Sequence, residues 1–252
     1  MRLYQSHLIL PFQSREMAIM MMNDPTEGLI YKILDWISTV TILNFFWILL
    51  TLLGGIIFGW APATVAVMAV WRLRMRGHQD APVVKTLWKE YRANFLPANG
   101  VGIVVVLAGA SLIFYSFTLS QWEGIFMAIF WMLFVFITVI YLIVLTFIFP
   151  VYIHYKIGFR EYFKYAFAIG ISHLHYVIMI VSATVVIFWA SGFFPAIYVL
   201  FTFSLIFMFI TRLSLIVFDK IEDRQRDGAN EEHIKTAKNK QRSNRLERKK
   251  CK

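Results

Sequence analysis

The sequence predicts an all-α, polytopic helical membrane protein with six membrane helices, or alternatively five, and two cytoplasmic interfacial amphipathic helices. Of its 252 residues, 59% are hydrophobic and 16% are charged, against about 25% charged in an ordinary soluble protein. Several apolar runs exceed the roughly 18 residues that indicate a helix long enough to span a bilayer. Basic residues gather in some connections between these runs and are missing from others, which is typical of an oriented membrane protein.

Residues 1–26 form an N-terminal extension ahead of the first hydrophobic run. Its only apolar stretch covers residues 8–12, which is shorter than the roughly 7–15 residues at the core of a signal peptide. Methionines at positions 17, 20, 21 and 22 directly precede the hydrophobic run. We therefore expect no cleaved signal, and we interpret residues 1–16 or 1–19 as the product of an upstream choice of start codon.

The first membrane helix is expected at residues 29–53, and a glycine-rich turn follows it. Gly54, Gly55 and Gly59 lower the helical propensity of this turn. Gly55 and Gly59 also have the GxxxG spacing that lets helices approach closely in lipid. The turn can thus serve either as a flexible connection or as a helix-packing site.

A second helix is expected at residues 62–76. Pro62 fits the first turn of a helix, where its missing N–H costs nothing, and we take Gly59, Pro62 and Thr64 as a candidate turn motif. At 1.5 Å per residue this helix reaches about 22 Å, which is less than the roughly 30 Å of the hydrocarbon core. It is therefore expected to be short, tilted or partly re-entrant. The arginines at 72, 74 and 76 are expected to form a charged collar at the lipid head groups.

The remaining elements follow from hydropathy and amphipathic spacing. Apolar residues recur every four positions in residues 83–96, among basic residues, which is typical of an interfacial helix. A second amphipathic segment is expected at residues 156–167. Further spans are expected at 98–119, 125–149, 168–190 and 193–218. The chain thus divides into the extension 1–26, a helical membrane domain at 27–218 and a charged basic tail at 219–252.

The positive-inside rule orients these spans. The loop at 72–97 carries six Lys and Arg, the segment 150–167 carries three, the tail from 219 carries twelve, and the turns at 120–124 and 191–192 carry none. The basic segments are therefore expected in the cytoplasm, together with the C-terminus. If the second helix crosses, there are six helices and both termini are cytoplasmic, which is the version we expect. If it only dips into the membrane, five spans remain and the N-terminus lies outside.

Two polar side chains within the predicted spans are candidate sites. Asn44 lies in the middle of the first span, where it can hydrogen-bond a neighbouring helix or contact a substrate. Arg212 lies near the cytoplasmic end of the last span, where it can either snorkel to the interface or serve a function.

The two amphipathic segments carry a candidate docking face. Its members are Trp88, Tyr91, Arg92, Arg160, Tyr162 and Lys164. Aromatic and arginine residues are enriched at protein interfaces, and the same residues suit anchoring in the membrane interface. Both interpretations therefore remain open at this point.

The sequence contains no HExxH, GxSxG, P-loop or GxGxxG motif. We therefore expect no enzyme activity, no catalytic residues, no cofactor and no metal. A transporter would need polar groups from several spans around a cavity, and the sequence offers Asn44, Ser111, Thr138, Ser182, Thr184 and Ser204. The tail can contact anionic lipids or be a solvated, disordered segment, and no nucleic-acid partner is expected. One cysteine, Cys251, allows no intramolecular disulfide.

The stretch "LNFFWILLTLLGGIIFGWAPATVAVMAVWRLRMRG" at 43–77, followed by "LWKEYRANFLPAN" at 87–99, resembles the YesL-like family of bacterial integral membrane proteins of unknown function. The most telling parts are Asn-x-x-Trp in the first helix and the Gly-x-x-Pro-Ala-Thr turn. The resemblance covers about residues 27–100 and implies no assigned activity.

The resemblance also implies a multi-pass protein of the bacterial cell membrane, associated with carbohydrate uptake through ABC-type importers. The first function class is thus an accessory or regulatory protein of such a system, acting through cytoplasmic-side contacts with importer subunits or other membrane proteins. The alternatives are a small transporter or channel in its own right and a scaffold that recruits partners to the inner leaflet.

Overall fold

The computed structural model describes residues 25–78, 81–121, 124–193 and 195–250, so most of the N-terminal extension lies outside the described residues. Within these ranges the fold consists of helices α2 to α8, without strands. Their bounds are α2 Pro25–Leu53, α3 Trp60–Met75, α4 Val83–Leu119, α5 Ile125–His154, α6 Phe159–Ser172, α7 Leu174–Gly192 and α8 Pro195–Lys250. The predicted all-α class is confirmed.

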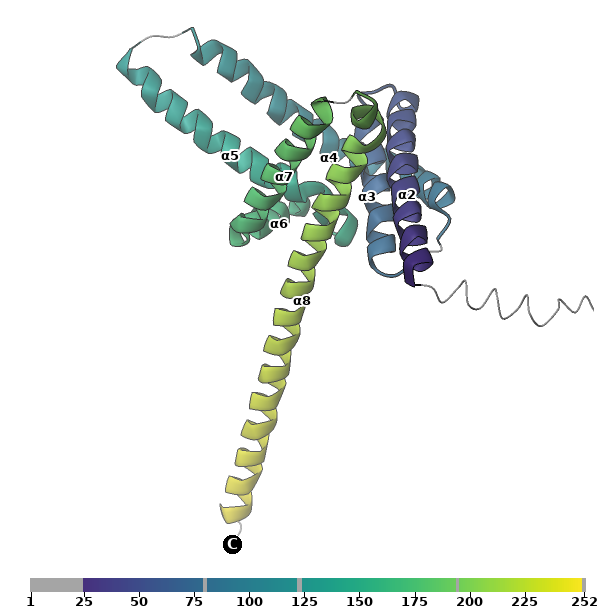
Figure 1. The fold of residues 1–252 in the computed structure, drawn as a ribbon. Coiled ribbons are helices and arrows are strands. Elements are labelled where there is room, and N and C mark those ends of the chain that lie inside the picture. Colours follow the sequence, from purple (N-terminus) through teal and green to yellow (C-terminus); the bar gives the residue numbers. More distant parts are fainter. Residues whose placement is uncertain (1–24, 79–80, 122–123, 194, 251–252) are drawn as a thin grey trace, which may run out of the picture.

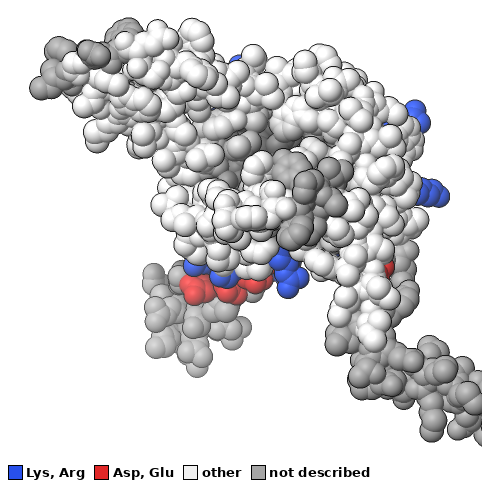
Figure 2. Space-filling model, turned by 45° about the horizontal axis from the view of Figure 1, so that its top comes forward, with Lys and Arg blue, Asp and Glu red and all other residues white. Residues whose placement is uncertain are grey.

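Among the described residues, five helices are long and apolar enough to cross a membrane: α2, α4, α5, α7 and the first half of α8. Their side chains are mostly apolar and exposed around the bundle, as lipid-facing residues are. Figure 2 shows one face that is almost entirely uncharged, with Lys, Arg, Asp and Glu along its lower edge and at one side. The protein is a multi-pass helical membrane protein.

Helix α3 is the short second helix that the sequence predicts, and it lies at the centre of the bundle. It has 16 residues, and every residue from Ala61 to Trp71 is buried. A helix that is apolar on all sides finds partners on all sides. Helices α2, α4 and α8 surround it, and α4 makes the most extensive contact. Figure 1 shows α3 running back alongside α2.

The connection from α2 to α3 is a tight turn over residues 54–59. A Cβ on Gly54 would lie 2.3 Å from the Cα of Gly59, and one on Gly59 would lie 2.3 Å from the carbonyl oxygen of Thr51. Gly55 has a φ of 72°, and a Cβ there would meet nothing. The close approach is therefore made by Gly54 with Gly59, rather than by the Gly55–Gly59 pair that the spacing indicated.

The separate interfacial helix expected at 83–96 is not present, because α4 continues through Pro97 to Leu119. Its first half packs against the protein through Leu87 and Tyr91, both buried. Gly102 faces the start of α3, where an added Cβ would lie 2.6 Å from the Cβ of Ala61. Membrane helices tolerate proline when neighbouring groups satisfy the freed backbone, so Pro97 need not end α4. The first half of α4 lies antiparallel to α3, and its second half leaves the bundle with α5 as a hairpin (Figure 1).

Three further boundaries differ from the prediction. Helix α5 does not end at Pro150 but contains it and runs to His154. The second amphipathic helix begins at Phe159 rather than 156, because Glu161 accepts a hydrogen bond from the N–H of Gly158 at 3.0 Å and caps the helix there. It extends to Ser172, so the next span begins at Leu174 rather than 168.

Helix α8 also continues past the expected boundary at 218. It runs without a break to Lys250 and extends away from the bundle (Figure 1). The charged tail is thus helical in the part that the structure describes, and not the disordered segment that its charge suggested. Glu222 precedes Arg226 by four residues, the spacing at which opposite charges support a helix.

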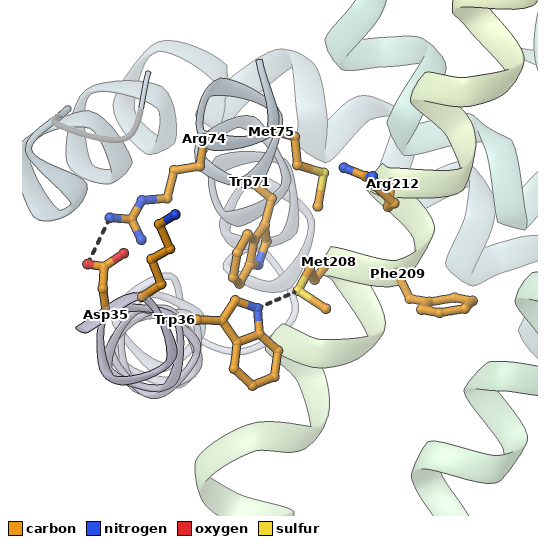
Figure 3. A pocket seen from close by; sticks show the side chains of 9 residues that line it. Asp35, Trp36, Trp71, Arg74, Met75, Met208, Phe209 and Arg212 are labelled. Atoms are coloured by element: carbon orange, nitrogen blue, oxygen red, sulfur yellow. Dashed lines mark hydrogen bonds and ion pairs between the residues drawn. The ribbon is translucent and has the colours of Figure 1, made fainter. Parts of the chain in front are cut away.

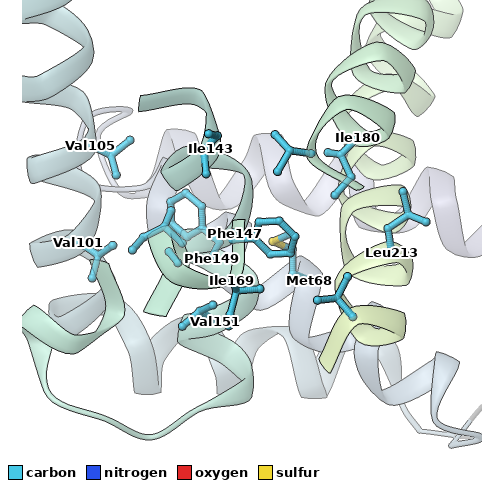
Figure 4. Close-up of a cluster of buried hydrophobic side chains, with 14 of the residues drawn as sticks. Met68, Val101, Val105, Ile143, Phe147, Phe149, Val151, Ile169, Ile180 and Leu213 are labelled. Carbon is cyan, nitrogen blue, oxygen red and sulfur yellow. The ribbon is translucent and has the colours of Figure 1, made fainter. Parts of the chain in front are cut away.

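Two buried clusters hold the bundle together. The larger one gathers side chains from α3 to α8 around Phe147, including Met68, Val101, Ile180 and Leu213 (Figure 4). The smaller one joins α2, α3 and the first half of α4. Both clusters include α3, so packing on both sides holds this helix, and with it its arginine-bearing end, in place against the neighbouring helices.

Candidate functional site at the arginine end of the bundle

The last turns of α3 carry Arg72, Arg74 and Arg76, and we call the part of the bundle around them the arginine end. Arg72 donates a hydrogen bond to the carbonyl oxygen of Ile153 in α5 at 2.5 Å. Arg74 hydrogen-bonds the hydroxyl of Thr39. Two of the three arginines therefore bind neighbouring helices, and Arg76 is exposed. The collar at the lipid head groups stays a prediction.

Arg74 also pairs with Asp35 of α2, and the two charged groups lie 3.3 Å apart. The side chain of Arg74 is only 14% exposed, whereas that of Asp35 is 43% exposed. A charge this deeply placed needs an opposite charge nearby. The pair therefore ties the arginine end of α3 to α2.

A cavity of about 640 Å³ opens between α2, α3 and α8 at this end, and we call it the α2–α8 cavity. Figure 3 shows Asp35 and Arg74 on one side and Arg212 on the other, with Trp71 and Met75 between them. Arg212, a candidate from the sequence, thus lies on the wall of a cavity that also contains the Arg74–Asp35 pair. The sequence offers no sign of this, because these residues are far apart along the chain.

A second cavity of about 610 Å³ lies between α3, α4, α5 and α6, and we call it the α4–α6 cavity. Its charged and polar lining includes Arg72, Arg76, Glu90, Asn94, Lys156 and Tyr162. The hydroxyl of Tyr152 donates to the side-chain oxygen of Asn94 at 3.0 Å, and its ring lies 5.0 Å from that of Tyr162. The two predicted amphipathic segments are therefore brought together around one polar cavity.

The six predicted docking residues do not share one environment. Trp88 is 43% exposed, and Arg92, Arg160 and Lys164 are also exposed. Tyr162 is half-buried in the wall of the α4–α6 cavity. Tyr91 is only 3% exposed and donates a hydrogen bond to the carbonyl oxygen of Leu50 at 3.1 Å. Tyr91 is thus a packing residue, and its assignment to an exposed face was wrong.

Asn44 lies completely buried between three helices. Its side-chain oxygen accepts a hydrogen bond from the backbone N–H of Ser204 in α8 at 2.9 Å. The indole N–H of Trp71 in α3 donates to the hydroxyl of the same serine at 3.3 Å. Asn44 therefore joins α2 to α8, next to a contact that joins α8 to α3.

The turn motif also has a packing role at the opposite end of α3. Gly59 precedes the first residue of α3, and Pro62 follows within its first turn. The hydroxyl of Thr64 donates to the carbonyl oxygen of Trp60 at 2.7 Å and accepts from the indole of Trp47 at 3.1 Å. Thr64 thus joins α3 to α2, and Trp47 is the tryptophan of the Asn-x-x-Trp motif.

Sequence reasoning missed the residues that hold α8 where it leaves the bundle. His154 Nε2 and Glu222 Oε1 lie 2.9 Å apart, joining the end of α5 to α8. Lys220 donates to the hydroxyl of Tyr176 in α7 at 2.7 Å. Burial raises the pKa of the adjacent Tyr155, and Glu222 and Tyr165 raise it further, so this phenol stays neutral at physiological pH. No spacing in the sequence links positions 154 and 222, so only the fold reveals this contact.

The polar groups that a transporter could use do not meet around a common cavity. Thr138, Thr184, Ser111 and Ser182 each donate to a carbonyl oxygen of their own helix. The other two, Asn44 and Ser204, bond each other between α2 and α8. The α2–α8 and α4–α6 cavities, which do have polar linings, lie at the arginine end instead.

The chain is similar to a family described as a protein of unknown function, DUF624, over residues 40–116. It is 30% identical to the uncharacterized protein YteU of Bacillus subtilis over 223 residues, covering 86% of this chain and 97% of YteU. It is 27% identical to the uncharacterized protein YesL of the same organism, covering 75% of this chain and 90% of YesL. No solved structure matches the chain significantly. This multi-pass chain, with its glycine turn and its buried short helix, thus belongs to the YesL-like family of membrane proteins of unknown function.

Proposed function

We propose that this protein is a non-enzymatic accessory or regulatory component of the bacterial cell membrane, and that it acts through protein contacts at its arginine end. That end faces the cytoplasm by the positive-inside rule. The family resemblance suggests carbohydrate uptake by an ABC-type importer as the process it serves. The importer's membrane subunits or other membrane proteins are then its partners, and its spanning helices contact the lipid bilayer.

One observation carries this proposal, namely that the two predicted amphipathic segments, which bear the exposed docking residues, both contribute to the lining of the α4–α6 cavity. The ring of Phe159 at the start of α6 lies 3.4 Å from where a Cβ on Gly100 of α4 would be. Arg92 and Arg160 are exposed on these two adjoining helices. A partner that lies over both helices can contact both arginines, and tryptophan, tyrosine and arginine are the residues enriched at energetically important interface positions.

The alternative function, a small transporter or channel, has weaker support. A transported polar solute needs hydrogen-bonding groups along its path through the membrane, because unpaired polar groups are costly there. The candidate polar groups within the spans bond their own helices or each other. We therefore favour the docking function over a transport path through the bundle.

The docking proposal is tested by affinity purification of the full-length protein in a mild detergent. Recovery of importer subunits with the wild-type protein supports it. We expect the double variant R92E/R160E to lose at least nine tenths of the recovered partner at unchanged expression, because two attractive contacts become repulsive. The matched control is R224E/R226E, which makes the same charge change on exposed residues of α8. Undiminished recovery by R92E/R160E, or an equal loss in the control, contradicts the docking face.

The proposed orientation is tested with a membrane-impermeant thiol reagent on intact cells. We expect the natural Cys251 to be labelled only after the membrane is permeabilised. In a C251S background, a cysteine introduced at the exposed Gln121, in the turn between α4 and α5, should be labelled in intact cells. Labelling of Cys251 in intact cells would show that the C-terminus lies outside the cell and would contradict the cytoplasmic position of the arginine end.

A further inference from the structure

The α2–α8 cavity carries more positive than negative charge. Lys32, Arg74 and Arg212 line it together with a single acidic residue, Asp35. Asp35 is engaged by Arg74 at 3.3 Å. Lys32 and Arg212 are exposed, and neither has a hydrogen bond or ion pair within the described part of the chain. Two cations therefore remain available to a ligand at the cavity.

The rest of the cavity wall is apolar and aromatic. Trp36 is 42% exposed there, and its indole N–H donates to the sulfur of Met208 at 3.3 Å. Figure 3 shows Met208 and Phe209 on α8 below Arg212, with Trp36 facing Met208. A ligand that fits both parts of the wall has a negatively charged group and an apolar body joined to it.

We propose that the α2–α8 cavity binds an anionic phospholipid, with Arg212 as the ligand of its phosphate and Lys32 as a second positive charge on the α2 side of the cavity. A guanidinium group presents paired N–H donors that match two phosphate oxygens, and an ammonium group adds a second positive charge. Long basic side chains near the ends of spanning helices reach the level of the head groups. Tryptophan prefers the same level, so Trp36 flanks the glycerol and the first carbons of the acyl chains.

A lipid fits this site better than a soluble phosphate compound does. A soluble anion would pair with Arg212 and Lys32 but would leave Trp36, Met208 and Phe209 in contact with water. A lipid covers these side chains as well, and apolar contact contributes in proportion to the area removed from water. The cavity also lies between two helices that are long and apolar enough to span the membrane, α2 and α8.

The test uses the full-length protein in a neutral detergent after removal of bound lipid. Three probes are titrated: a short-chain phosphatidylglycerol, a phosphatidylcholine with the same chains, and glycerol 3-phosphate. Binding is followed by native mass spectrometry and by the shift in the thermal unfolding temperature. We expect phosphatidylglycerol to bind at least ten times more tightly than either other probe.

Variants separate the cavity from the other basic surfaces. R212Q and K32Q should each weaken phosphatidylglycerol binding about tenfold, which corresponds to about 1.4 kcal/mol. R160Q, which removes an exposed arginine of α6 outside the cavity, should stay within about twofold of the wild-type affinity. The charged tail at 219–252 is identical in all of these proteins, so its contribution to lipid binding cancels in the comparison.

The proposal is overturned if R212Q and K32Q both bind phosphatidylglycerol as tightly as R160Q does. Equal binding of phosphatidylcholine would show that the charge of the head group is not recognised. Equal binding of glycerol 3-phosphate would show that a soluble phosphate is the ligand and would refute the lipid. Since K32Q and R212Q each change one exposed side chain, at least one of them should fold and keep the test decisive.

Discussion

Replacing Asn44 with alanine should destabilise the bundle while leaving its helices intact. Asn44 is completely buried, and its side-chain oxygen accepts the N–H of Ser204 across the contact between α2 and α8. Alanine removes this acceptor and leaves unfilled space between the helices. The hydrogen bond from Trp71 to the Ser204 hydroxyl does not involve Asn44 directly, so α3 should remain attached to α8.

The expected loss is about 1–2 kcal/mol of unfolding free energy. Hydrogen bonds between membrane helices contribute about 0.6 kcal/mol on average and about 1.7 at most. The value stays in this range because Ser204 lies inside α8, where its N–H retains a carbonyl of its own helix as a partner. The space left by the removed amide adds a further cost, since buried side chains relax only partly around a cavity.

The measurement is unfolding in mixed detergent micelles at increasing fractions of dodecyl sulfate, followed by circular dichroism. The matched control is S111A, because Ser111 is exposed and its hydroxyl bonds the carbonyl of Leu107 in its own helix. This control should stay within about 0.5 kcal/mol of the wild type. An N44A protein that unfolds at the wild-type midpoint would refute the structural role of Asn44 and reopen the possibility of a substrate contact.

Two other variants test the packing of α3 and the attachment of α8. G102A should lower the unfolding free energy by about 1–3 kcal/mol through overpacking, because the new Cβ would lie 2.6 Å from a methyl group of α3. Its control, G192A, should be neutral because a Cβ there meets nothing. Equal midpoints of the two variants in the same unfolding assay would contradict this prediction. E222A removes the partner of His154 and should speed tryptic cleavage of α8 just beyond the bundle about two- to fivefold, because a partly exposed pair contributes up to about 1 kcal/mol. D223A is its control, and equal cleavage rates in both variants would argue against the attachment.

The pattern of apolar residues was sufficient to predict the class and the order of the helices. It predicted a short second helix after the Gly59–Pro62 turn, and α3 begins at Trp60 and has 16 residues. It also singled out Arg212, which lines the α2–α8 cavity. These features depend on local composition and spacing. Helix rise and bilayer thickness set how many apolar residues a spanning helix needs, so the sequence alone is enough to predict them.

The ends of several helices could not be predicted in the same way. The predicted helices stopped at residues 96 and 149, directly before Pro97 and Pro150, but α4 and α5 continue through these prolines. The apolar stripe with Leu87 and Tyr91 was assigned to the lipid interface, but it is buried against α2 and α3. A stripe of apolar side chains satisfies lipid and a neighbouring helix equally well, so its spacing does not distinguish the two.

The sequence by itself thus determined that the chain is a helical membrane protein, where its spans lie and which of its loops are basic. Only the tertiary structure decided which polar groups come together. It placed Asn44 against Ser204, and Arg74 against Asp35, and it put Arg212 and Lys32 on the wall of one cavity. The physical reason is that spanning requires only a local length of apolar residues, whereas a site requires contacts between helices whose packing no local pattern specifies.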